Sequence, residues 1–116
     1  MTFLPNHENA IIDSSKLKDY ILSPTHPIGK FKAIYFKRAG YTDKSWQILE
    51  RDIREQHLSK DIKEEENTSF GKKYRITSSL KGPDSVIIIT SVWIILKGEK
   101  FPRLITIIPG GEVNEI

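Results

Sequence analysis

The sequence predicts an α+β fold in which two or three N-terminal helices pack on one face of a C-terminal antiparallel sheet of three to four strands. Apolar residues recur at helical spacing over about residues 14–58, whereas about residues 70–109 follow a period of two or are continuously apolar. Turn sequences rich in glycine and proline separate the expected strands. Helices followed by a meander of strands are typical of this class, and the length suits one domain, 1–116.

Three helices are expected in the first half of the chain. Residues 14–22 follow Asp13 as N-cap and should end before Pro24, because a residue that precedes proline avoids the helical region. The second helix covers residues 30–39, and the third covers residues 43–58. The side chains expected to face the core are Phe31, Ile34 and Tyr35 in the second helix and Trp46, Leu49 and Ile53 in the third.

Three strands are expected in the second half, after the polar stretch 59–71. Residues 72–80 alternate between apolar and polar side chains. Residues 86–96 are apolar on both faces, as in a central strand, and residues 103–108 form the last strand. With the helices on one face of the sheet, the opposite face is left open as a binding surface.

The composition indicates a soluble globular chain, with 38% hydrophobic and 28% charged residues. No apolar run approaches the roughly 20 residues of a membrane span, and the N-terminus lacks the pattern of a signal peptide. The absence of cysteine excludes disulfides and thiolate metal sites. We therefore expect a cytoplasmic protein that does not associate with membranes.

Positive charge is concentrated in residues 14–44, which contain seven basic and two acidic residues. Such a patch is typical of proteins that bind nucleic acid or an acidic protein. The alternative is a lysine-rich surface that is only solvated. The distribution of charge, taken alone, favours this alternative over a binding patch.

Several kinds of chemistry are excluded by the residues present. His7, His26 and His57 lie far apart without the spacing of zinc ligands. The chain has no glycine-rich phosphate-binding loop, and the last expected strand has neither the acid nor the lysine of a metal-dependent nuclease. We therefore expect neither a metal nor a cofactor, and we expect His7 and His57 at the surface.

The remaining side chains suit one reaction, the cleavage of RNA by its own 2'-hydroxyl. That reaction requires a proton acceptor, a proton donor and cations that stabilise charge developing on the phosphate. Histidine transfers protons near neutral pH, and lysine and arginine neutralise phosphate. An aromatic ring can stack on an unpaired base.

The first candidate group lies in the segment HPIGKFK, where a loop leads into the second expected helix. We expect His26 to act as general acid or base and Lys30 and Lys32 to bind phosphate. Free N–H groups and the positive end of the helix dipole would assist them. The alternative is that His26 only packs against Pro24 and Pro27.

The second candidate group lies on the strands. Arg103 and Thr106 on the last strand are expected to bind and orient the phosphate during catalysis. Arg75, on the first expected strand, would bind substrate, and Trp93 would stack on a base unless it packs in the core. Strict alternation places Arg103 and Thr106 on opposite faces of the sheet unless a β-bulge intervenes.

Two blocks of the sequence, "IID..KL.DYIL.P.HP.GK.KA..F" and "VWII..GE.FPRLIT", resemble an uncharacterised bacterial domain family that is common in cyanobacteria. Its members occur as small proteins and as C-terminal modules of toxin-like chains. The resemblance extends from Leu4 to Pro109 and implies a toxin with a small antitoxin-like protein partner, because small members lie beside a second small gene. Family members often end in Thr-x-Tyr-Pro, whereas Ile108 occupies the tyrosine position here.

The order of helices and strands is also similar to that of the barnase–EndoU–colicin–RelE group of metal-independent ribonucleases. The resulting hypothesis is a toxin of a toxin–antitoxin pair that cleaves RNA without a metal ion. The alternative is a non-catalytic module whose basic patch binds nucleic acid or an acidic protein. The two differ in whether RNA is turned over or only bound in a salt-sensitive manner.

Overall fold

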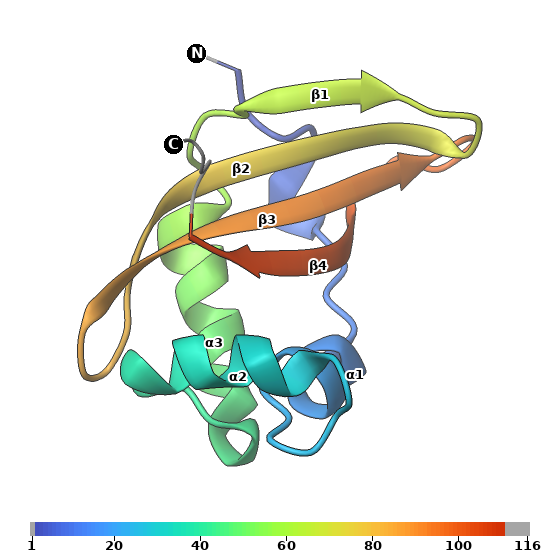
Figure 1. Ribbon diagram of the computed structural model, residues 1–116. Coiled ribbons are helices and arrows are strands. Elements are labelled where there is room, and N and C mark those ends of the chain that lie inside the picture. The colour runs from blue at the N-terminus through green and yellow to red at the C-terminus, as the bar shows by residue number, and fades with distance from the viewer. Residues whose placement is uncertain (1, 111–116) are drawn as a thin grey trace, which may run out of the picture.

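The computed structural model describes residues 2–110 and has the predicted α+β architecture (Figure 1). The helical elements, with η for short 3₁₀ or π-type turns, are η1 (His7–Asn9), α1 (Ser14–Lys16), η2 (Leu17–Ile21), α2 (Gly29–Arg38), η3 (Asp43–Ser45), α3 (Trp46–Asp52) and η4 (Ile53–His57). The strands are β1 (Glu64–Asn67), β2 (Gly71–Lys81), β3 (Val86–Leu96) and β4 (Arg103–Pro109). They form one antiparallel sheet in the order β1-β2-β3-β4. No helix within residues 2–110 has the length and apolar character that crossing a bilayer requires.

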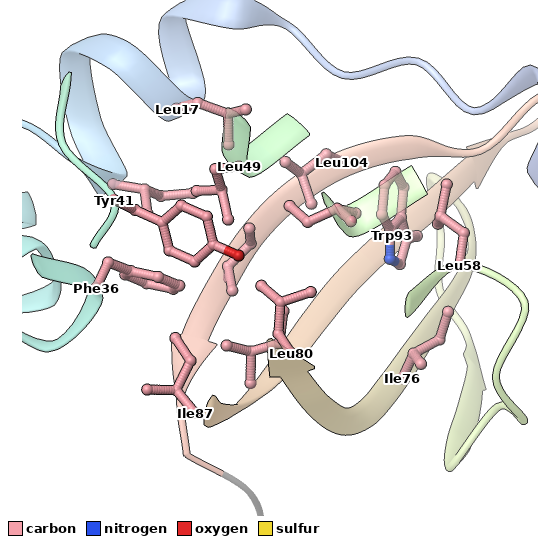
Figure 2. Close-up of a cluster of buried hydrophobic side chains, with 14 of the residues drawn as sticks. Leu17, Phe36, Tyr41, Leu49, Leu58, Ile76, Leu80, Ile87, Trp93 and Leu104 are labelled. Carbon is pink, nitrogen blue, oxygen red and sulfur yellow. The ribbon is translucent and has the colours of Figure 1, made fainter. Parts of the chain in front are cut away.

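One hydrophobic core joins the helices to one face of the sheet (Figure 2). Phe36 from α2, Leu49 from α3, Trp93 from β3 and Leu104 from β4 all belong to it and are almost completely buried. Burying one such side chain contributes about 1.5–3 kcal/mol relative to leaving it in water. We call this the core face of the sheet and its opposite the outer face.

The core-facing side of α2 differs from the predicted one. Phe31 and Ile34 are 67% and 61% exposed, whereas Phe36 and the small residues Gly29 and Ala33 are buried. A Cβ atom at Gly29 would collide with the carbonyl oxygen of Tyr20, so the start of α2 lies directly against that backbone. Small residues allow this close approach. Of the predicted stripe, Phe31 and Ile34 point to solvent, whereas Tyr35 is half-buried and packs against the core.

Strand β1 was not predicted, because it lies in the polar stretch 59–71 and has no apolar alternation. All four of its side chains are exposed. Cross-strand ion pairs hold it to β2: Glu64 to Arg75 and Glu65 to Lys72, both with a separation of 3.2 Å. Charged side chains of this kind are common on edge strands, where they discourage pairing with other chains.

Candidate functional site

The side chain of His26 caps the N-terminus of α2. Its Nδ1 accepts hydrogen bonds from the backbone N–H groups of Ile28 and Gly29, at 3.0 and 2.9 Å. The first N–H groups of a helix lack partners within the helix, and this ring nitrogen satisfies two donors there. In the neutral imidazole, an accepting Nδ1 places the ring proton on Nε2. His26 therefore offers Nε2–H as a hydrogen-bond donor.

Tyr20 connects His26 to Lys32. The rings of Tyr20 and His26 meet edge to face, with centroids 4.8 Å apart. The ammonium of Lys32 lies 4.8 Å from the centroid of the Tyr20 ring, and its Nζ donates a 2.7 Å hydrogen bond to Oγ1 of Thr106. All four side chains are half-buried. The ammonium is thus fixed at the edge of β4 by an aromatic ring and a hydroxyl group.

A β-bulge places Arg103 and Thr106 on the same face of the sheet. Arg103 pairs with Ile94 and Thr106 pairs with Val92, while the register shifts between Val92 and Trp93 of β3. Ile105 is the extra residue on β4, because its neighbours Leu104 and Thr106 take adjacent register positions. Strict alternation would place Arg103 and Thr106 on opposite faces unless a β-bulge intervened. The bulge is present, and both side chains lie on the outer face of the sheet.

Arg75 lies on the outer face as well, since it pairs with Val92, which in turn pairs with Thr106. Two strand spacings separate Arg75 from Thr106, or about 10 Å. We call Lys32, Arg75, Arg103 and Thr106 the outer-face cluster. It combines three cations with a hydroxyl group, which is suited to binding a phosphate.

Both arginines of the outer-face cluster are paired with exposed glutamates. Nε of Arg75 lies 3.2 Å from Glu64, and Arg103 donates two hydrogen bonds to the carboxylate of Glu99, at 2.9 and 3.2 Å. The bonds to Glu99 raise the pKa of Arg103, and the same bonds lower the pKa of Glu99. Exposed pairs of this kind are worth little, so a phosphate group can compete for either arginine.

Residues 3–111 match a protein family described as a domain of unknown function (DUF6883). The chain belongs to this family. No curated protein matches the sequence. Among solved structures, the DUF6883 chain is similar to a chain of a contact-dependent growth inhibition toxin–immunity protein complex from Klebsiella pneumoniae 342, with a TM-score of 0.60 and 19% identity. The match covers 85% of this chain and 98% of that chain, and at this identity it concerns the fold alone.

Two residues predicted to bind substrate lie elsewhere in this DUF6883 domain. Trp93 is fully buried on the core face, where its Nε1 donates to Oγ of Ser91 at 2.7 Å, so it cannot stack on a base. Lys30 is exposed on α2, with its Nζ 5.3 Å from the ring centroid of Phe31. Because Lys30 and Lys32 are two positions apart on a helix, they project from different sides of it.

His57 was expected at the surface, and this prediction is wrong. Its ring is fully buried against the core face of the sheet, with Nδ1 2.6 Å from Oγ of Ser78 on β2 and Nε2 2.6 Å from Oγ of Ser91 on β3. Burial, assisted by the nearby positive charge of Lys60, lowers the pKa of His57 to about 4. A neutral, fully hydrogen-bonded ring of this kind stabilises the core and has no access to a substrate.

Tyr20 is the site residue that the sequence did not reveal, because Leu17, Tyr20 and Ile21 recur at helical spacing, which is typical of residues that face the core. Only the approach of α2 to η2 places its ring between His26 and Lys32. Ile108 lies half-buried on the outer face, two residues beyond Thr106 and paired with Thr90. Within residues 2–110, no three histidine or carboxylate side chains gather into a group that could hold a metal ion.

Proposed function

We propose that this protein is the toxin of a toxin–antitoxin pair and that it cleaves RNA without a metal ion. The observation that carries the proposal is the hydrogen bond between Lys32 and Thr106, which fixes an ammonium on the outer face of the sheet, the face that also carries Arg75 and Arg103. Two further observations support it: the likeness of the fold to a chain of a toxin–immunity protein complex, and the family resemblance of the two sequence blocks.

In the proposed reaction the RNA supplies its own nucleophile. The 2'-oxygen forms a bond to the adjacent phosphorus as the bond from phosphorus to the 5'-oxygen breaks. The proton of the 2'-hydroxyl passes to water, and the departing 5'-oxygen takes a proton from water. Negative charge gathers on the phosphate oxygens in the transition state, where Lys32 and the two arginines stabilise it.

The role of His26 differs from the acid–base role predicted from the sequence. A histidine that accepts and releases a proton at Nε2 cycles between the neutral ring with its proton on Nδ1 and the imidazolium, so Nδ1 carries a proton in both states. That proton would oppose the N–H groups of Ile28 and Gly29, both of which point at Nδ1. We assign His26 to capping α2 and to donating a hydrogen bond from Nε2–H to phosphate, and we assign most of the catalysis to electrostatic stabilisation.

The second candidate function is a non-catalytic module that binds nucleic acid or an acidic protein. The commitment of His26 to the helix cap favours it, because the outer-face cluster then lacks a group that readily transfers protons. This alternative predicts that the protein binds RNA without cleaving it. The affinity should fall steeply as the salt concentration rises, because binding to phosphates releases counterions.

The deciding experiment is incubation of the purified chain with total RNA in EDTA, followed by analysis of the RNA ends. We expect products that carry 2',3'-cyclic phosphate and 5'-hydroxyl ends. Salt-sensitive binding without cleavage of tRNA, mRNA or ribosome-bound RNA would support the binding module and overturn the ribonuclease proposal.

A further inference from the structure

Helix α2 presents large apolar side chains to solvent. Ile28, the N-cap residue of α2, is 64% exposed, and Phe31 and Ile34 within the helix are 67% and 61% exposed, so the three follow one another at intervals of three residues. Residues at this spacing lie on one side of a helix. Single exposed apolar residues are ordinary, but a continuous row on one helix is typical of a surface that binds another molecule.

A groove of about 380 Å³ lies beside this row. Phe31 and Ile34 form one wall, and the buried residues Leu22 and Tyr41 contribute to the lining. Most of the lining is therefore apolar, which suits the insertion of an aliphatic or aromatic side chain.

The charged residues at the groove indicate which partner it fits. Lys30 and Lys37 line it on α2, and Asp43 is the one acid among the described lining residues. The two lysines are seven positions apart, which corresponds to about 10 Å along the helix axis. A partner with an apolar side chain between two carboxylates about 10 Å apart would complement both the groove and its charge.

The groove and the outer-face cluster use different sides of α2. The ammonium of Lys32 lies at the edge of β4 against Thr106, whereas Lys30 and Lys37 border the groove. One helix thus separates a surface suited to phosphate from a surface suited to an acidic protein. A partner in the groove need not cover Lys32 to be bound tightly.

We propose that the groove bordered by Lys30 and Lys37 is the docking site of an inhibitory protein partner, which inserts an apolar side chain beside Phe31 and Ile34 and places carboxylates against the two lysines. The inference rests on the proposed function, since it assigns the antitoxin of that function to a surface. The proposal assigns partner binding to the groove and RNA binding to the outer-face cluster. If one basic surface served both, the same substitutions would weaken both kinds of binding.

Isothermal titration calorimetry of the full chain tests the proposal, with the probe being the small protein that the family resemblance implies in the neighbouring gene. We expect Phe31→Ser with Ile34→Ser, and separately Lys30→Glu with Lys37→Glu, to weaken binding at least 100-fold. These side chains are exposed, so both double variants should fold, which circular dichroism checks. Lys32→Met is the matched control on the other side of α2 and should bind the probe within about threefold of the wild type.

The outcomes separate this proposal from the proposed function. Loss of probe binding in both groove variants supports the groove even if the wild type cleaves no RNA, because calorimetry does not depend on cleavage. Unchanged binding in the groove variants, or failure of the wild type to bind the probe, overturns it whatever the RNA assay shows. Self-association of the wild type that Phe31→Ser with Ile34→Ser abolishes would assign the groove to a second copy and also overturn the proposal.

Discussion

Lys32 of α2 and Thr106 of β4 are joined by a 2.7 Å hydrogen bond, although 74 residues separate them in the chain. The bond brings one lysine of the helical half to the outer face of the sheet. Lys32 is half-buried there, and a charge at a half-buried position interacts with a phosphate with less screening than a charge on an open surface.

Replacing Lys32 with methionine should lower the rate of RNA cleavage by about 100-fold, since one preorganised donor to the developing negative charge is lost. Methionine keeps the apolar stem against Tyr20, so the free energy of unfolding should change by less than about 1 kcal/mol. Cleavage in EDTA and urea unfolding measure the two effects. Lys44→Met removes a lysine outside the cluster and should leave cleavage within about twofold of the wild type. Equal losses in the two variants would contradict a specific role for Lys32.

Replacing His26 with asparagine should preserve the helix cap, because an asparagine side-chain oxygen accepts hydrogen bonds at helix N-termini as well as any residue. We expect stability within about 0.5 kcal/mol of the wild type, whereas His26→Ala should lose about 1 kcal/mol. Cleavage by the asparagine variant should stay within about tenfold of the wild type, because only the Nε2–H donor is displaced. A loss of 1,000-fold together with a flattened pH–rate profile would instead restore His26 to an acid–base role.

Replacing Gly29 with alanine should destabilise the fold by about 3 kcal/mol, because the new methyl group collides with the backbone carbonyl of Tyr20, which cannot move aside. Gly98→Ala is the matched control. Its φ of +84° strains alanine, but no atom lies within 4 Å of the added Cβ, so the cost should be about 1 kcal/mol. Urea denaturation ranks the two variants, and the reverse order would show that α2 does not depend on this contact.

Replacing Ile108 with tyrosine should raise RNA cleavage several-fold if the tyrosine of the resembled family contributes a donor to the phosphate. The substitution places a phenolic hydroxyl on the outer face near Thr106, and Ile108 is only half-buried, so the sheet should tolerate it. Ile105→Tyr adds the same group at the bulge and serves as a control. Unchanged cleavage by the Ile108 variant would show that the position has no catalytic part in this chain.

The sequence predicted the order of the elements because most of them carry a clear apolar period. It missed β1, whose residues Glu64 to Asn67 form a strand through cross-strand ion pairs and have no apolar face. It also chose the wrong side of α2, because Phe31 and Ile34 fit a helical stripe as well as the residues that are buried. Neither helix propensity nor the apolar period reveals that Gly29 packs directly against the backbone carbonyl of Tyr20.

The candidate site was predicted in part for related reasons. Lys32 and Thr106 were named from their chemistry, but only tertiary packing brings them together. The common face of Arg103 and Thr106 depends on the extra residue in β4, and a bulge has no reliable sequence signal in this strand. His57 was misplaced because its partners, Ser78 and Ser91, lie on strands that are remote in sequence from its helix. Trp93 follows the alternative given for it, packing in the core.

Stability should decrease as the pH falls from about 6.5 to 4, because His57 is buried in its neutral form. Its pKa is about 4 in the folded chain, compared with 6.5 for an unperturbed histidine. Between these values the unfolded chain binds a proton that the folded chain does not, so the contribution is complete above pH 6.5 and is lost as the pH approaches 4. A shift of this size corresponds to roughly 3 kcal/mol.

Urea unfolding at pH 7 and pH 4 measures the effect in the wild type and in His57→Gln. Glutamine can hydrogen-bond to Ser78 and Ser91 but does not titrate, so its stability should depend less on pH by roughly 3 kcal/mol. Asp13 and Glu99 also have lowered pKa values, but they are exposed and present in both proteins, so their contributions cancel in the comparison. If the glutamine variant does not fold, Ser78→Ala keeps the titrating ring and should keep the pH dependence. Identical pH dependence in the wild type and a folded glutamine variant would show that His57 is not the titrating group.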